Sequence, residues 1–219
     1  MFTLRIWDLP TRLFHWALAA CVVGLIVSGK VGGDAMVWHF RLGYAVLTLL
    51  IFRLLWGLMG GHWSRWTQLP LWPQQVWAYL KGVSQVSFAG HNPLGSWSIV
   101  AMLLVLGFQV GTGLVSDDEI ANAGPLSTWV SGAWVTWATS WHKQWGQWLV
   151  VFLVVLHLGA LIWYRFRQRE FLVSAMLHGQ KTLPVAVPES HDRFAHRLLA
   201  LVLLVISSVG VWFLVSQGT

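Results

Sequence analysis

The chain has few charged residues for its length. Only 10% of its 219 residues are Asp, Glu, Lys or Arg, whereas a soluble domain usually has about 25%. Hydrophobic residues make up 56% of the chain, and the mean hydropathy is +0.61. This composition excludes an ordinary soluble domain and indicates an integral membrane protein. The net charge of +6 therefore reports orientation in a membrane rather than a nucleic-acid partner.

Cysteine and acidic residues are scarce as well. The single cysteine, Cys21, lies inside an apolar run, which excludes a disulfide framework, a CxxCH motif for covalent haem attachment and a cysteine-ligated iron–sulfur cluster. None of the eight acidic residues lies well inside an apolar run. A transporter of metal cations would be expected to carry carboxylates at that depth, so their absence there argues against one.

What the chain does have is apolar runs of membrane-spanning length. We predict an all-α integral membrane protein with five transmembrane helices, at about Leu13–Val27, Val37–Met59, Leu94–Val115, Trp141–Tyr164 and Phe194–Val215. The first four would form a bundle domain over residues 1–170. Residues 171–219 would hold a cytoplasmic linker and the fifth helix. The stretch LWPQQVWAYLKG predicts a short amphipathic helix at the membrane surface.

The basic residues predict the orientation. With the N-terminus in the cytoplasm, eleven Lys and Arg residues lie inside and only Lys30, Arg41 and Lys143 lie outside. We therefore expect a multi-pass protein of a bacterial inner membrane, with its C-terminus in the periplasm. The acidic loop Asp117–Glu119 would face the outside.

Four histidines lie at two matched depths in this arrangement. His39 and His142 would lie near the outer face, and His15 and His157 near the inner face. Each pair could hold one haem iron between two helices, and nitrogen at both axial positions favours electron transfer over oxygen binding. The simpler alternative is that single histidines bond to nearby carbonyls. Ionisable groups inside a membrane usually serve function, which favours ligation.

Further residues are candidates for haem contact. Trp38-His39 and Trp141-His142 both begin the pattern W-H-x-x-x-G, so Gly43 and Gly146 would leave room for a flat macrocycle. Arg41 and Lys143 could meet haem propionates of the outer haem. Inside the second helix, Arg53 would pair with an inner propionate or with lipid phosphate. His91 would help to start the third helix, or contact the inner haem or a quinone.

At these residues the chain resembles the prokaryotic di-haem b-type cytochromes of the cytochrome b561 family. That family includes b subunits of nickel–iron hydrogenases, gamma subunits of formate dehydrogenases and a superoxide oxidase. The resemblance covers about Ile6 to Gln180 and rests on these stretches: WDLPTRLFHW, WHFRLGY, GHNPLG and WHKQWGQWLVVFLVVLH. It implies two haems b, an inner one on His15 and His157 and an outer one on His39 and His142. It also implies menaquinol or ubiquinol as a reaction partner.

The chain departs from the family in two ways. His142 and His157 are 15 residues apart, whereas the family more often has them one residue closer. The extra residue turns one imidazole by about 100° relative to the other, so either a local π-bulge absorbs it or another ligand, such as His91, serves the inner haem. The fifth helix lies outside the family's four-helix core and would complete a homodimer or partner interface.

The predicted function is transfer of electrons between the quinone pool and a periplasmic redox partner. That partner would be a c-type cytochrome or an oxidoreductase subunit. An alternative within redox chemistry is a superoxide:quinone oxidoreductase, which the outer cations would favour and the acidic loop would oppose. The alternative of another class is a haem-free membrane scaffold or a metal transporter.

Overall fold

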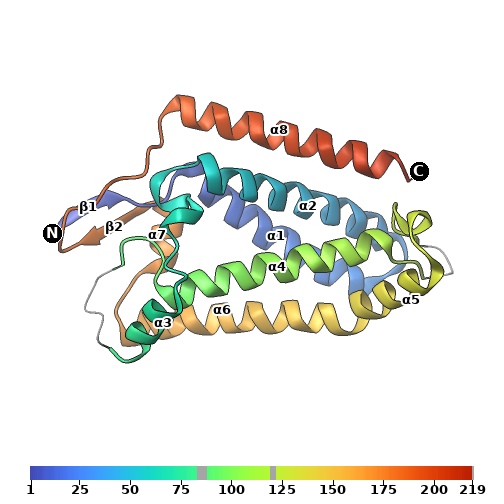
Figure 1. The fold of residues 1–219 in the computed structure, drawn as a ribbon, viewed down its shortest axis with the longest axis horizontal. Coiled ribbons are helices and arrows are strands. Elements are labelled where there is room, and N and C mark those ends of the chain that lie inside the picture. Colours follow the sequence, from blue (N-terminus) through green and yellow to red (C-terminus); the bar gives the residue numbers. More distant parts are fainter. Residues whose placement is uncertain (83–87, 119–121, 219) are drawn as a thin grey trace. The chain divides into compact units, whose positions relative to one another are not determined.

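The computed structural model describes residues 1–82, 88–118 and 122–218, so Glu119 of the predicted acidic loop lies outside the described residues. Figure 1 shows the order of the elements along the chain. They are β1 (Phe2–Arg5), α1 (Leu9–Val31), η1 (Gly33–Ala35), α2 (Met36–Met59), η2 (His62–Ser64), η3 (Trp66–Gln68), α3 (Pro73–Leu80), α4 (Pro93–Val115), η4 (Ser127–Trp129), α5 (Gly132–Ser140), η5 (Trp141–Gly146), α6 (Gln147–Arg167), α7 (Leu172–His178), β2 (Gln180–Leu183) and α8 (Phe194–Ser216).

The predicted transmembrane helices are confirmed. Among the described residues, five helical stretches are long and apolar enough to cross a membrane: Leu9–Val31, Gly33–Met59, Pro93–Val115, Gly132–Arg167 and Phe194–Ser216. The predicted surface helix is present as α3, which begins with proline and leaves Trp72 and Trp77 exposed. Its position at a membrane surface remains a prediction.

Two of these helices begin where capping residues predict. The backbone N–H of Thr11 donates a 2.8 Å hydrogen bond to Asp8 Oδ1 at the start of α1. At the start of α4, the N–H of Gly95 donates to Asn92 Oδ1 at 2.7 Å, and Pro93 occupies the first helical position. Each cap satisfies an N–H that has no partner within its own helix.

The described residues form two compact units. The first comprises Met1–Phe14, Arg53–Ala101 and Val155–Leu201, and the second comprises His15–Phe52, Met102–Val154 and Val202–Thr219. Each unit is described below by itself. The predicted division at residue 170 remains a prediction.

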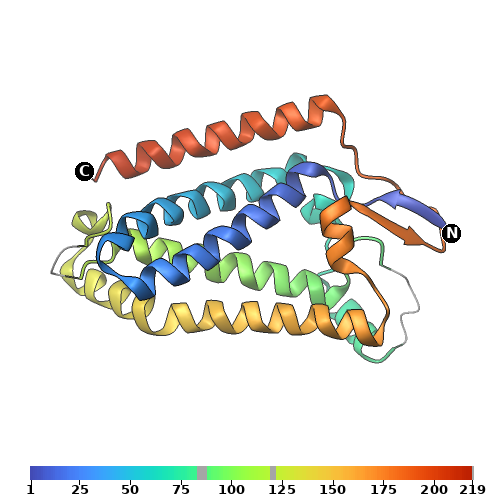
Figure 2. The ribbon, with the colours of Figure 1, turned by 180° about the vertical axis from the view of Figure 1, so that it is seen from behind.

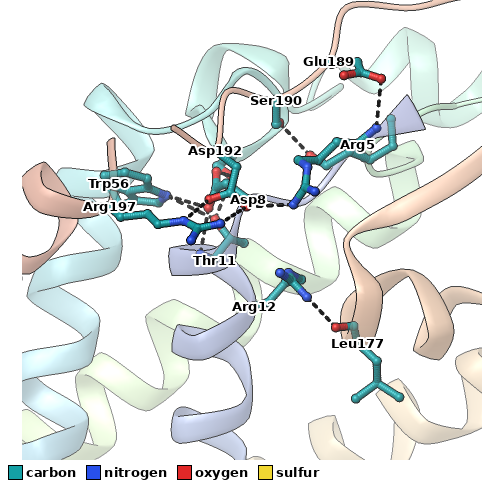
Figure 3. A network of polar contacts seen from close by, with 12 residues as sticks. Arg5, Asp8, Thr11, Arg12, Trp56, Leu177, Glu189, Ser190, Asp192 and Arg197 are labelled. Atoms are coloured by element: carbon teal, nitrogen blue, oxygen red, sulfur yellow. Dashed lines mark hydrogen bonds and ion pairs between the residues drawn. The ribbon is translucent and has the colours of Figure 1, made fainter. Parts of the chain in front are cut away.

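A buried carboxylate organises part of the first unit. Asp8 has no exposed surface, and besides capping α1 it accepts hydrogen bonds from Ser64 Oγ at 2.6 Å and Trp56 Nε1 at 3.2 Å (Figure 3). Gly61 lies so close that a Cβ there would collide with the Asp8 carboxylate. Asp8 therefore links the start of α1 to the end of α2 and the loop that follows it.

A small antiparallel sheet in the first unit has no counterpart in the sequence prediction. β1 pairs with β2 in the register Phe2 to Leu183 and Arg5 to Gln180, and both ribbon views show the two strands side by side (Figures 1 and 2). Gly179 ends α7 with φ at +84°, a conformation that glycine adopts without strain. Its carbonyl accepts hydrogen bonds from the N–H groups of Ile6 and Trp7. The N-terminal strand is thereby fastened to the predicted linker.

Ion pairs fasten the same linker a second time. Asp192, whose side chain is 3% exposed, accepts hydrogen bonds from Arg5 at 2.7 Å and from Arg197 at 2.9 Å (Figure 3). Burial by itself raises the pKa of Asp192, but the hydrogen bond and charge of Arg197, the N–H of Leu9 and the charge of Arg5 outweigh it and lower the pKa.

Protonating Asp192 is expected to loosen this attachment. Because its pKa is depressed in the folded protein, the carboxylate stabilises the fold above the unfolded-state pKa of about 3.9, and that contribution is lost as the pH falls through the folded-state pKa. We expect D192N to speed hydrogen exchange of the backbone amides of residues 2–5 at pH 7, and this effect to diminish as the pH falls through the folded-state pKa of Asp192. An acceleration that stays the same as the carboxylate is protonated would contradict this assignment.

Candidate functional site

The second unit brings together two of the four predicted haem ligands. His39 lies in the first turn of α2 and His142 lies in η5, a π-helix of six residues. Their ring centroids are 6.0 Å apart, and the ring planes are 86° to one another. The two histidines predicted to ligate the outer haem therefore lie close together in the structure.

A neighbouring helix orients the His39 ring. Its Nδ1 lies 3.1 Å from the carbonyl oxygen of Leu25 on α1, to which it donates, and 3.4 Å from Ser28 Oγ. Gly29, four residues after Leu25, faces the ring, since a Cβ there would lie 3.2 Å from Cε1 and Nδ1 of His39. The ring is held between a backbone acceptor and a glycine on one face of α1.

The His142 ring is held in the same way by α4. Its Nδ1 donates to the carbonyl oxygen of Gln109 at 2.9 Å, and a Cβ at Gly113, four residues later, would lie 2.8 Å from Cε1. In both histidines the Nδ1–H is used, which leaves Nε2 as the nitrogen with a free lone pair. Such outer hydrogen bonds fix the tautomer and orientation of metal-binding imidazoles.

The two glycine contacts yield a test by matched substitution. In G113V the new side chain would push the His142 ring from its present position, whereas a Cβ at Gly111 on the same helix meets nothing within 4 Å. We expect G113V to weaken retention of whatever His142 ligates by about 10-fold or more. The control G111V carries the same change in helix propensity and is expected to leave ligation unchanged. Equal losses in both variants would point to a general helix defect.

The π-helix at His142 corresponds to the first of the two alternatives stated above for the extra residue. Over an α-helix, fifteen residues leave two side chains about 60° apart around the axis, and fourteen leave them about 40° apart on the other side. A π-bulge takes one additional residue into a turn. Because η5 takes up one extra residue, the angle around the helix axis between His142 and His157 is close to that expected for a 14-residue spacing. That shorter spacing is the one that the family more often has.

The remaining residues predicted around the outer pair lie at the same end of the second unit. Arg41 and Lys143 are exposed, and the Arg41 guanidinium lies 5.2 Å from the Trp38 ring. A Cβ at Gly43 would meet nothing within 4 Å, so space is open there. The room beside Gly146 is taken by the Gln109 side chain, with which a Cβ would collide. Direct haem contact of these four residues remains a prediction.

The residues predicted around the inner haem are divided between the units. His15 on α1 belongs to the second unit and His157 on α6 to the first, and their pairing remains a prediction. Arg53 on α2 is 4% exposed, and its guanidinium lies 4.3 Å from the Trp66 ring centroid. Its Nη1 is buried without a hydrogen-bond partner among the described residues.

His91 lies beside the start of α4, in agreement with the prediction that it helps to start the third transmembrane helix. It directly precedes the capping residue Asn92, and its ring packs on that of Trp7 with centroids 4.5 Å apart. Contact of His91 with a haem or a quinone remains a prediction.

Sequence reasoning missed the residues that orient the ligands. Leu25 and Gln109 act through backbone carbonyls, which carry no side-chain signal, and Gly29 was not singled out. Gly113 carries no signal in the sequence that separates close helix packing from a role beside a ligand. The one available signal was Gln109 itself, a polar side chain inside an otherwise apolar run, since such residues usually have a partner.

Comparison with known proteins identifies the family. A sequence model described as prokaryotic cytochrome b561 matches residues 6–179, most of the chain. The chain belongs to the prokaryotic cytochrome b561 family. It is 26% identical to a probable Ni/Fe-hydrogenase B-type cytochrome subunit of Bradyrhizobium diazoefficiens, over 82% of this chain and 86% of that protein. It is 23% identical to a probable Ni/Fe-hydrogenase 1 B-type cytochrome subunit of Escherichia coli K12, over 81% of this chain and 90% of that protein.

Membership of the cytochrome b561 family confirms the predicted class of protein and its cofactor. The chain is a multi-pass membrane cytochrome that holds haem b and carries electrons. The His39–His142 pair fits that cofactor. An iron with an imidazole nitrogen about 2 Å away on each side separates the two ring centroids by roughly 6 Å, and the observed separation is 6.0 Å. The free Nε2 atoms also suit axial ligation.

Proposed function

We propose that this cytochrome b561 carries electrons across the membrane through two haems b, between the quinone pool and a redox partner on the periplasmic side. The observation that carries the proposal is the His39–His142 pair, with centroids 6.0 Å apart and both Nδ1 atoms engaged by backbone carbonyls. In the proposed orientation this pair holds the outer haem. His15 and His157 hold the inner one.

The buried guanidinium of Arg53 supports an inner haem. A cation in a membrane-spanning helix is costly unless it meets an anion, and Arg53 Nη1 is buried and unbonded among the described residues. The charge of Asp8 acts on Arg53, and a haem propionate would in addition accept a hydrogen bond from the unbonded Nη1. The π-turn at His142 also supports the pairing, because it keeps His157 in the helical phase that the family's ligands have.

The chain's own residues determine what chemistry the bound groups can perform. Haem b supplies a one-electron carrier when bound. His39 with His142, and His15 with His157, would each hold one haem through two imidazoles, which would favour electron transfer over oxygen binding. The carbonyls of Leu25 and Gln109 hold the imidazoles in place and raise their basicity as ligands. A rigid, fully ligated site of this kind favours electron transfer over binding of a substrate at iron.

The distribution of basic residues supports the proposed orientation of the chain in the membrane, and the relatives support the proposed class of redox partner. Eleven basic residues against three favour an N-terminus in the cytoplasm by the positive-inside rule. Relatives named as hydrogenase cytochrome subunits favour an oxidoreductase subunit, such as a hydrogenase, as the periplasmic partner. A c-type cytochrome is the other candidate. Asp117 and Asp118 in the outer loop would steer a basic partner.

Reconstitution into liposomes tests the proposal. A quinol added to the membrane is expected to reduce both haem components and then a water-soluble acceptor on the outer side only. H157A is expected to stop transfer to that acceptor while leaving the His39–His142 haem in place. If H157A reduced the acceptor as fast as the unmodified protein, this would contradict an electron-transfer path through both haems.

The same vesicles test the superoxide:quinone alternative. The exposed cations Lys30, Arg41 and Lys143 belong to the second unit, as His39 and His142 do, and would attract an anion. Superoxide generated outside would then reduce the haems as rapidly as quinol does. Slow reduction by superoxide would favour the partner-linked function.

A further inference from the structure

Gln109 contacts the outer ligand histidine twice. Its backbone carbonyl accepts the hydrogen bond from His142 Nδ1, and its side-chain Nε2 donates a 2.9 Å hydrogen bond to the His142 backbone carbonyl. One residue of α4 therefore holds both the ring nitrogen Nδ1 and the backbone carbonyl of His142.

The Gln109 side chain also packs against the outer surface of the π-turn. It lies where a Cβ at Gly146 would be, so the glycine at the end of η5 admits the amide. In a π-turn a carbonyl bonds to the N–H five residues ahead rather than four, and the wider ring is less favourable than an α-turn. An amide of a neighbouring helix that packs against the turn and donates to one of its carbonyls stabilises that wider form.

From these contacts we infer that Gln109 is a positioning residue for the outer haem: its side-chain amide clamps the π-turn and so fixes the plane of the His142 imidazole. The plane matters because the His39 and His142 rings are nearly perpendicular, at 86°. Were these two rings to hold a haem, their mutual orientation and the hydrogen bonds to them would adjust its electronic structure and its redox potential. The inference rests on the proposed function, because it requires that His142 binds haem.

Q109L tests the clamp without removing the ligand. The variant keeps the backbone carbonyl that accepts from Nδ1 and loses only the amide. Q147L is a matched control, because the Gln147 amide also donates to a carbonyl of the π-turn, that of Lys143, without contacting His142. We expect both variants to retain two haems. Q109L should shift the largest g value in the EPR spectrum and the midpoint potential of the outer haem, and Q147L should shift neither.

Gly146 supplies a second test that does not depend on Q109L. G146A should shift the same EPR signal, because its Cβ displaces the Gln109 side chain. In a Q109A background the collision with the amide is gone and only the 2.9 Å approach to Trp141 Nε1 remains, so G146A should add a much smaller shift. A wild-type spectrum and potential in Q109L, or an equal effect of G146A with and without Gln109, would overturn the inference. Absence of the outer haem from the unmodified protein would overturn the proposed function as well.

Discussion

Replacing His142 with alanine is expected to halve the haem b content of the purified protein, from two per chain to one. His142 shares its iron with His39, and neither ring has a second histidine in the proposed scheme that could take its place. With one axial nitrogen gone, the remaining imidazole holds haem weakly and exposes the iron to solvent. The haem on His15 and His157 uses neither ring and is expected to remain, with its absorbance band and potential unchanged.

A histidine outside the proposed ligand set provides the control. His178 ends α7, is exposed and lies in the first unit. H178A is therefore expected to retain both haems. H39A should reproduce H142A, since the two residues form one site. Loss of both haems in H142A, with the protein still folded by circular dichroism, would contradict independent pairs.

The second large effect is expected at Asp8. Its carboxylate accepts from the Thr11 N–H, Ser64 Oγ and Trp56 Nε1, all of which are buried. D8A removes a helix cap and leaves the two side-chain donors without this acceptor. Thr11 Oγ1 lies 2.7 Å from Ser64 Oγ and 3.2 Å from Trp56 Nε1, so it would compensate in part. We expect the free energy of unfolding to fall by about 2–3 kcal/mol.

The Asp8 substitution also removes a negative charge that interacts with Arg53. Thermal unfolding in detergent, followed by tryptophan fluorescence, measures the loss. D34A removes an exposed acid from η1 and is the matched control, with an expected change within about 0.5 kcal/mol. A D8A protein as stable as D34A would mean that the buried network contributes little to the fold.

The sequence predicted the features that depend on local patterns. Apolar runs predicted the five helices, and the extra residue between His142 and His157 indicated a π-bulge as one of two alternatives. The pairing of His39 with His142 followed from their common depth. Each of these predictions depends on the residues within one apolar segment or on the order of the apolar segments along the chain.

Features that depend on contacts distant in sequence were missed. β1 and β2 have four residues each and lie about 180 positions apart, so neither strand carries a usable pattern by itself. The helices are apolar on all sides, which hides the faces that meet. Gln109 could thus be seen as a polar residue in an apolar run, but its contact with His142 required the arrangement of α4 and η5.

Electron transfer across the membrane through this chain requires two haems b, and a pyridine haemochrome assay of the purified protein counts them directly. The chain's mass and tryptophan content give the protein concentration, so the ratio is measured in one sample. We expect two haems b per chain. A ratio of one would remove one of the two histidine pairs, and a ratio of zero would contradict the electron-transfer function altogether.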